Sequence, residues 1–229
     1  MIYRPCPPKD DWIATREGYD RWACGYDDAD ASTLLDEPLI ASLCLPLEGL
    51  RILDLGCGTG RYLRLLKALG TLLVGVDLSY EMLHRAKRQD YVPSWLQARA
   101  GWLPFQKGVF DRVVSGLLID HVNDLPGFFQ SVVYVLAPAG RVVIAAIHPE
   151  MQRLTGSAVW FRDGPDEYRI SGVIHEVPAL VGAARSAGLT LVEQHEPCID
   201  ANVIKRRPEW KNRLGCPAFV VLAFQKEPI

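Results

Sequence analysis

The residues best suited to chemistry lie where an apolar run gives way to glycines. Gly56, Gly58 and Gly60 alternate after the apolar run of residues 51–55, and an acid, Asp54, lies two residues before the first glycine. Glycine allows a sharp turn with positive φ and leaves the main chain open to a ligand. A carboxylate so close to the turn disfavours a pyrophosphate and favours a ligand with a positively charged end.

A second acid, Asp77, ends the next apolar run, residues 72–76. A carboxylate at the tip of a strand accepts hydrogen bonds from a ribose diol, and it is expected roughly 20 residues after the first strand. Dinucleotide-binding turns have the pattern G-x-G-x-x-G, whereas Arg61 and Tyr62 follow Gly60 here. The pattern therefore predicts a site for a nucleoside ligand that has a positively charged end, and it disfavours a dinucleotide site.

The elements that hold these residues follow from periodicity. Residues 51–55 and 72–76 are short apolar runs typical of buried parallel strands. Between them, residues 61–69 carry apolar side chains at helical spacing, and Gly70 ends the predicted helix. Strand, glycine turn, helix, strand and acid together form half of a Rossmann-like nucleotide site.

The run D-L-G-C-G-T-G, residues 54–60, resembles motif I of class I S-adenosylmethionine-dependent methyltransferases. The resemblance covers residues 19–146 and implies an α/β fold: a Rossmann-like, seven-stranded mixed sheet with helices on both faces and the last strand antiparallel. It also implies an N-terminal helical cap and a small lid inserted after the fifth strand. The expected cofactor is S-adenosyl-L-methionine, and the expected product is S-adenosyl-L-homocysteine.

The resemblance also implies which residues hold the cofactor. Leu78 and Met82 are expected to flank the adenine and ribose, with core packing as the alternative for Met82. Tyr19 belongs to a Y-D-x-W-A-x-x-Y-D segment whose tyrosines close over the cofactor in similar proteins; the alternative is that its aromatic residues only pack the N-terminal helix. The full expected set is Tyr19, Asp54, Gly56, Cys57, Gly58, Gly60, Asp77, Leu78, Met82, Gly101, Trp102, Leu103, Ser115, Gly116 and Leu117.

One position departs from the family pattern. Arg99 stands where the family has an acid that accepts a hydrogen bond from the adenine amino group. A guanidinium has no acceptor, so it cannot replace that acid. The backbone around Gly101 and Trp102 is the expected substitute, with the Trp102 ring as a stacking face.

Two histidines, His121 and His148, are the candidate catalytic residues. Both fall just past the carboxyl ends of predicted strands, where open α/β sheets bind ligands. Histidine suits a general base, which is needed when the methyl acceptor arrives protonated. The alternative for His121 is a packing role.

Length and composition limit the remaining possibilities. A chain of 229 residues fits one α/β domain, with expected parts at 1–46 (cap helices), 50–147 (cofactor core), 148–176 (substrate lid) and 177–229 (the rest of the sheet). The net charge of −2 argues against a nucleic-acid or membrane partner. The six cysteines lack zinc spacing, so we expect no metal site, reduced thiols and a cytoplasmic location. A monomer or homodimer is expected.

Outside the motifs the pattern predicts further elements. A hairpin turning at residues 163–166 should form the lid, and a helix should begin at Pro178. Residues 189–193 and 218–224 should be the sixth and seventh strands, the latter inserted antiparallel. Ser32 should cap a helix that reaches Leu43, with a kink at Pro38. The basic run at 205–213 is expected to be solvated surface, with a clamp for an acidic substrate as the alternative.

The functional prediction is transfer of a methyl group to the oxygen, nitrogen or carbon of a small molecule. A protein that binds S-adenosylmethionine or its product without methyl transfer is the first alternative, since Arg99 departs from the pattern. A nicotinamide-dependent oxidoreductase is the second, and the missing third glycine and Asp54 disfavour it.

Overall fold

A computed structural model of the chain describes residues 12–27, 35–67, 71–88, 94–156 and 158–228. Its main sheet has seven strands in the order β4-β3-β2-β5-β6-β10-β9. All neighbours are parallel except β10, which runs antiparallel to β6 and β9. The strands are β2 (Arg51–Leu55), β3 (Leu72–Asp77), β4 (Ser94–Gln97), β5 (Phe110–Gly116), β6 (Leu136–Ile147), β9 (Leu189–His195) and β10 (Phe219–Lys226). The predicted fold class is confirmed.

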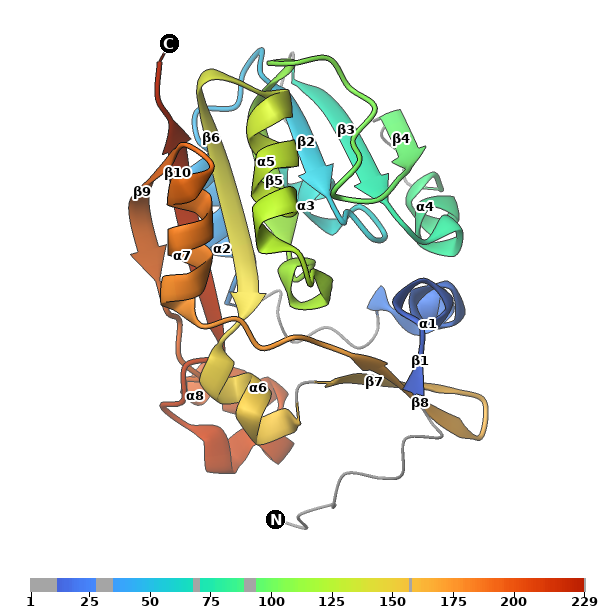
Figure 1. Cartoon of the computed structure of the whole chain (residues 1–229). Coiled ribbons are helices and arrows are strands. Elements are labelled where there is room, and N and C mark those ends of the chain that lie inside the picture. The colour runs from blue at the N-terminus through green and yellow to red at the C-terminus, as the bar shows by residue number, and fades with distance from the viewer. Residues whose placement is uncertain (1–11, 28–34, 68–70, 89–93, 157, 229) are drawn as a thin grey trace.

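Helices cover both faces of this sheet. On each face, the helices pack their apolar side chains against the strands and form a hydrophobic core on that side. On one face α2 (Glu37–Cys44), α3 (Arg61–Leu66) and α4 (Tyr80–Ala86) pack against the strands. On the other face lie α5 (Leu125–Val135) and α7 (Val177–Ser186), which are in front of the sheet in Figure 1. Because β2 pairs in parallel with β3 and β5, the strand ends that carry the glycine turn and Asp77 meet at one edge of the sheet.

The structure differs from the sequence-based predictions at several boundaries of helices and strands. Helix α2 begins at Glu37, so Pro38 lies in its first turn, where proline is tolerated, and does not produce a kink. Ser32 and Gly70 lie outside the described residues. Strand β6 begins at Leu136, because Leu136 already pairs with Phe110 of β5.

The predicted hairpin is confirmed, and it has a partner from the other end of the chain. Strands β7 (Ala158–Asp163) and β8 (Asp166–Ser171) are antiparallel, and β1 (Trp12–Ile13) pairs in parallel with β8. Helix α1 (Thr15–Trp22) packs on this three-stranded sheet. Figure 1 shows α1 and the hairpin facing the carboxyl ends of β2, β3 and β5. We call β1, α1 and residues 23–27 the cap.

The predicted basic loop forms helical turns. Helix α8 (Ala201–Arg206) and a 3-10 helix (Pro208–Arg213) pack with α6 (Pro149–Thr155) around Met151 and Phe219. Among the residues that the structure describes, no helix is both long and apolar enough to cross a bilayer.

Candidate functional site

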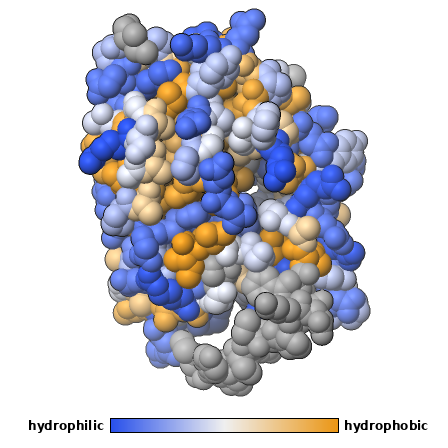
Figure 2. Space-filling view, viewed as in Figure 1, coloured by the Kyte–Doolittle hydropathy of each residue, from blue (hydrophilic) through white to orange (hydrophobic). Residues whose placement is uncertain are grey.

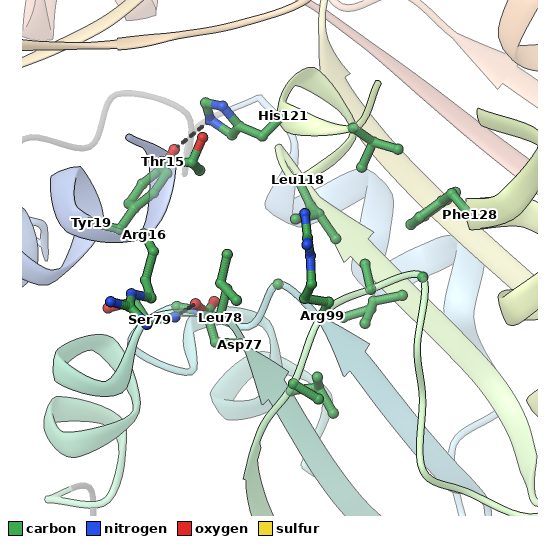
Figure 3. Close-up of a pocket in the computed structure, with 18 of the residues that line it drawn as sticks. Thr15, Arg16, Tyr19, Asp77, Leu78, Ser79, Arg99, Leu118, His121 and Phe128 are labelled. Atoms are coloured by element: carbon green, nitrogen blue, oxygen red, sulfur yellow. Dashed lines mark hydrogen bonds between the residues drawn. The ribbon is translucent and has the colours of Figure 1, made fainter. Parts of the chain in front are cut away.

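A cavity of about 500 Å³ lies between the carboxyl ends of β2, β3 and β5 and the cap. Figure 3 shows its walls, and in the space-filling view the surface is hollowed between the sheet and the α1 region. Residues from the glycine turn, the ends of β3 and β5, the loop after β4 and the cap line it. A volume of this size is in the range of small-molecule sites, about 300–1,000 Å³.

The glycine turn between β2 and α3 forms the floor of the cavity. Gly56, Gly58 and Gly60 have φ of 76°, 53° and 86°, values that side chains with a Cβ rarely adopt. A Cβ on Gly56 would lie 2.8 Å from the Cβ of Leu118. The glycines therefore allow the turn and also keep open the space between the two strand ends.

Asp77 holds the turn and faces the cavity. Its carboxylate accepts hydrogen bonds from the backbone N–H of Gly58 and of Ser79, each at 2.8 Å. Burial raises the pKa of Asp77, and the backbone donors oppose that shift. A carboxylate fixed by two N–H groups at the tip of β3 is placed as a diol acceptor requires.

Asp54 is buried beneath the turn, and neither carboxylate oxygen has a hydrogen-bond partner among the described residues. Burial, and next the charge of Asp77, raise the pKa of Asp54 to about 8. The Ser115 hydroxyl, on the neighbouring strand β5, is also buried without a partner in the described part of the chain. A buried acid without a donor is costly, and a cationic ligand end relieves that cost. These residues fit the amino-acid end of S-adenosylmethionine.

The cap is hydrogen-bonded to the core through two aspartates that the sequence analysis did not identify. Asp20 accepts from the Ser79 hydroxyl at 2.6 Å, and Asp27 accepts from the Thr59 hydroxyl at 2.6 Å. Each follows a tyrosine in the repeated Y-D pair, which is the signal that could have found them. The Ser79 hydroxyl oxygen also accepts from the Met82 N–H and so caps α4.

Tyr19 and His121 meet at the top of the cavity. The Tyr19 hydroxyl lies 2.8 Å from His121 Nε2, and His121 Nδ1 lies 3.1 Å from the Ser171 carbonyl oxygen (Figure 3 for the first contact). Both side chains line the cavity. Burial lowers the pKa of His121 and raises that of Tyr19, so both are neutral at pH 7.

His148 is not among the cavity-lining residues. Its Nδ1 accepts from the Glu150 N–H and caps α6, while its Nε2 lies 3.6 Å from a Glu196 carboxylate oxygen. The structure therefore brings His121 to the cavity and assigns His148 a local structural contact.

The loop after β4 contributes Arg99 and Trp102. Figure 3 shows Arg99 pointing into the middle of the cavity, opposite Tyr19. Trp102 lines the rim, and its side chain is 83 % exposed. An indole this open has a free face for a planar ring.

The other predicted positions divide into two groups. Those that line the cavity are Gly56, Gly58, Asp77, Leu78, Met82, Gly101, Gly116, Leu117 and Tyr19. Those that do not are Asp54, Cys57, Gly60, Leu103 and Ser115. Cys57 packs behind the turn with Leu63 and Leu83, so its side chain supports the turn. Lining residues that the sequence analysis missed include Thr15, Arg16, Asn123, Asp124 and Phe128.

The described residues contain no group of three or more histidine, cysteine or acidic side chains arranged for a metal ion. Cys24, Cys44, Cys57, Cys198 and Cys216 are free thiols.

Comparison with known proteins gives a consistent result. The family described as "Methyltransferase domain" matches residues 53–144, from β2 into β6. The malonyl-[acyl-carrier protein] O-methyltransferase of Erwinia pyrifoliae is 31% identical over 146 residues, which are 64% of this chain and 55% of that protein. A ubiquinone biosynthesis O-methyltransferase of Chelativorans sp. is 30% identical over 160 residues, covering 63% of this chain and 60% of that one.

The chain thus spans about 55–60% of the length of these two curated relatives. Among solved structures, an S-adenosylmethionine-dependent methyltransferase from Mesorhizobium loti superposes with a TM-score of 0.69 at 24% identity. That match covers 87% of this chain and 99% of the other, and it shows a common fold.

Proposed function

Because this chain belongs to the class I S-adenosylmethionine-dependent methyltransferases, we propose that it transfers a methyl group from S-adenosylmethionine to a small molecule. The single observation that carries the proposal is the placement of two acids at the glycine turn, one lining the cavity and one buried beneath its floor. Asp77 lies at the tip of β3, and Asp54 is buried without a donor beneath the glycine turn.

The cofactor supplies an electrophilic methyl group, so the chain's own residues bind, orient and exclude water. Asp77 accepts the ribose hydroxyls, and Asp54 compensates the ammonium of the amino-acid end. Leu78 and Met82 pack against the nucleoside, and Trp102 covers the adenine from the rim. Gly116 and Leu117 line the neighbouring wall, at the end of β5.

His121 is the proposed general base, since it lines the cavity and its Nε2 lies 2.8 Å from the Tyr19 hydroxyl. The relatives bear names that include malonyl-[acyl-carrier protein] and ubiquinone biosynthesis. These names support a small acceptor, whose reacting atom is oxygen, nitrogen or carbon. His148 does not line the cavity, so no contact supports it as the general base.

Arg99 favours a second candidate, a protein that binds the cofactor or its product without transferring methyl. Its guanidinium occupies the middle of the cavity and offers no acceptor to the adenine amino group. The nicotinamide alternative lacks support, because Arg61 stands where the pattern G-x-G-x-x-G has its third glycine and because β10 is inserted antiparallel.

The remaining partner assignments are also part of this proposal. Free thiols support a cytoplasmic location, and the net charge of −2 supports action without nucleic acid. We also propose that the protein is a monomer or homodimer.

Calorimetric titration of the protein with S-adenosylmethionine, S-adenosylhomocysteine and NAD tests the proposal first. Micromolar binding of the first two, with none for NAD, is the expected result. Absence of binding by both sulfur ligands overturns it. Conversion of radiolabelled S-adenosylmethionine in the presence of mixed small-molecule acceptors then distinguishes the enzyme from a binding protein.

A further inference from the structure

Two hydrogen bonds fix which nitrogen of His121 carries the proton. A carbonyl oxygen only accepts, so the Nδ1 that lies 3.1 Å from the Ser171 oxygen must carry the hydrogen. In a neutral ring Nε2 is then bare and accepts from the Tyr19 hydroxyl at 2.8 Å. The order of donors is therefore Tyr19 to His121 to Ser171.

This order places the phenol between the base and the cavity. The lone pair of Nε2 is already used by Tyr19, so an acceptor molecule does not give its proton to His121 directly. The Tyr19 oxygen still has lone pairs free to accept, and the side chain lines the cavity.

We propose that Tyr19 is the catalytic residue that receives the acceptor's proton, with His121 taking the phenol proton, and that the acceptor is a hydroxyl compound. The proposal rests on the methyl transfer proposed above. As the acceptor O–H bond breaks, its proton moves to the Tyr19 oxygen, and the Tyr19 proton moves to His121 Nε2. The acceptor oxygen forms the new bond to the methyl carbon. The carbon–sulfur bond breaks, and its electron pair stays on sulfur.

The surroundings suit a relay whose resting state is uncharged. Burial, and then the charges of Tyr26, Asp120 and Asp77, raise the pKa of Tyr19 and so oppose a tyrosinate. His121 is hydrogen-bonded to the phenol, and Arg99 lies across the cavity from it. The imidazolium that forms during the step donates through Nδ1 to the Ser171 carbonyl. The neighbouring residue in the sequence, Asp120, carries a carboxyl group. Charge therefore builds up on the ring, which has an acceptor in place, and not on the phenol.

The Ser171 carbonyl belongs to β8, so the hairpin sets the tautomer of the base. Two further contacts hold this segment to the loop after β5: the Val173 N–H donates to the Asp120 carbonyl at 2.7 Å, and His175 Nε2 lies 2.8 Å from the Val122 carbonyl. The hairpin thus contributes to the chemistry and does more than cover the cavity.

The first test uses nitrogen NMR of the imidazole in the S-adenosylhomocysteine complex. The expected result is a protonated Nδ1 and a bare, hydrogen-bonded Nε2, with the Nε2 signal moving to that of an unbonded nitrogen in Tyr19→Phe. Tyr134→Phe, which alters an exposed tyrosine on α5, should leave the signal unchanged. A proton on Nε2 of His121 overturns the relay.

The second test compares phenols with anilines matched ring for ring, each with S-adenosylmethionine. Methyl transfer to phenol oxygen is expected, and Tyr19→Phe should lower kcat about 100-fold or more with the cofactor Kd changed less than twofold. Three results would overturn the proposal. They are faster wild-type turnover of anilines than of phenols, no turnover of any phenol, and an unchanged kcat in Tyr19→Phe. Since cofactor binding is measured in the same samples, failure of the relay is distinguished from failure of the proposed function.

Discussion

Asp77 combines two roles, and a single substitution removes both. Asp77→Ala removes the diol acceptor and also leaves the Gly58 and Ser79 N–H groups without their partner. We expect affinity for S-adenosylhomocysteine to fall by about 1–3 kcal/mol. Calorimetry measures the loss, and a thermal melt of the free protein reports the structural part.

The matched control for this substitution is Asp163→Ala. Asp163 is exposed at the tip of the hairpin, and no change in affinity is expected there. If Asp77→Ala and the wild type bind S-adenosylhomocysteine with equal affinity, the ribose does not bind at the tip of β3.

Asp54 makes binding depend on pH. Its pKa is raised to about 8 in the free protein, so the carboxyl is protonated at pH 7. A bound ammonium favours the carboxylate, so binding releases a proton below pH 8, and affinity rises with pH between 6 and 8. Titrations of S-adenosylhomocysteine in buffers of different ionisation enthalpy measure that proton.

Asp54→Asn supplies the comparison for this pH dependence. The variant keeps the shape of the side chain but has no proton to release, so its affinity should be weaker and flat over the same pH range. A wild-type enthalpy that does not vary with the buffer would contradict the assignment.

At the scale of elements, the packing of the cap depends on one close approach between α1 and β8. A Cβ on Gly18 of α1 would lie 2.5 Å from Ile170 Cγ1 of β8, and Ile170 is fully buried. Gly18→Ala should therefore cost about 1–3 kcal/mol by overpacking, partly offset by the better helix propensity of alanine. Denaturant unfolding measures the change.

A double-mutant cycle separates this clash from a general effect of the substitution. Ile170→Ala removes the atoms that clash, so the double variant should lose less stability than the sum of the two single variants, by about 0.5–3 kcal/mol. Additive losses would mean that α1 and the hairpin do not support one another.

Sequence reasoning located the strands, the glycine turn and Asp77 because short-range patterns specify them. It could not locate the pairing of β1 with β8, since strands of two residues carry little periodicity and their partners are far apart in sequence. For the same reason it placed Tyr19 and His121 in the site on separate grounds without finding that they touch. His148 follows a strand as His121 does, but whether a side chain faces a cavity depends on the local turn, which here makes it a helix cap.

For the whole molecule, buried acids make stability fall as pH rises. The pKa values of Asp54 and Asp120 are raised to about 8 and about 7, against 3.8 in an unfolded chain. The folded state therefore holds more protons from about pH 4 to 8, and unfolding becomes easier across that window. His121, whose pKa is lowered, acts in the opposite sense only below about pH 6.5.

Between pH 6.5 and 8 we expect the free energy of unfolding of the ligand-free protein to fall by about 1–2 kcal/mol because of Asp54 alone. Denaturant curves at several pH values measure the slope. Asp54→Asn should make the slope shallower and leave the part that Asp120 contributes, whereas Asp163→Asn should not change it. A slope of opposite sign would show that Asp54 is ionised in the free protein.

The pairing of β1 with β8 also has a consequence during synthesis. Residues 12–22 leave the ribosome before any strand of the main sheet, yet their partner strand, Asp166–Ser171, is made only after β6 is complete. Domains begin to fold as they emerge, so the nascent core can assemble while residues 12–22 still lack a partner. Helix α1 is thus among the last of the described elements to settle, and the cavity gains its upper wall only when the hairpin is made.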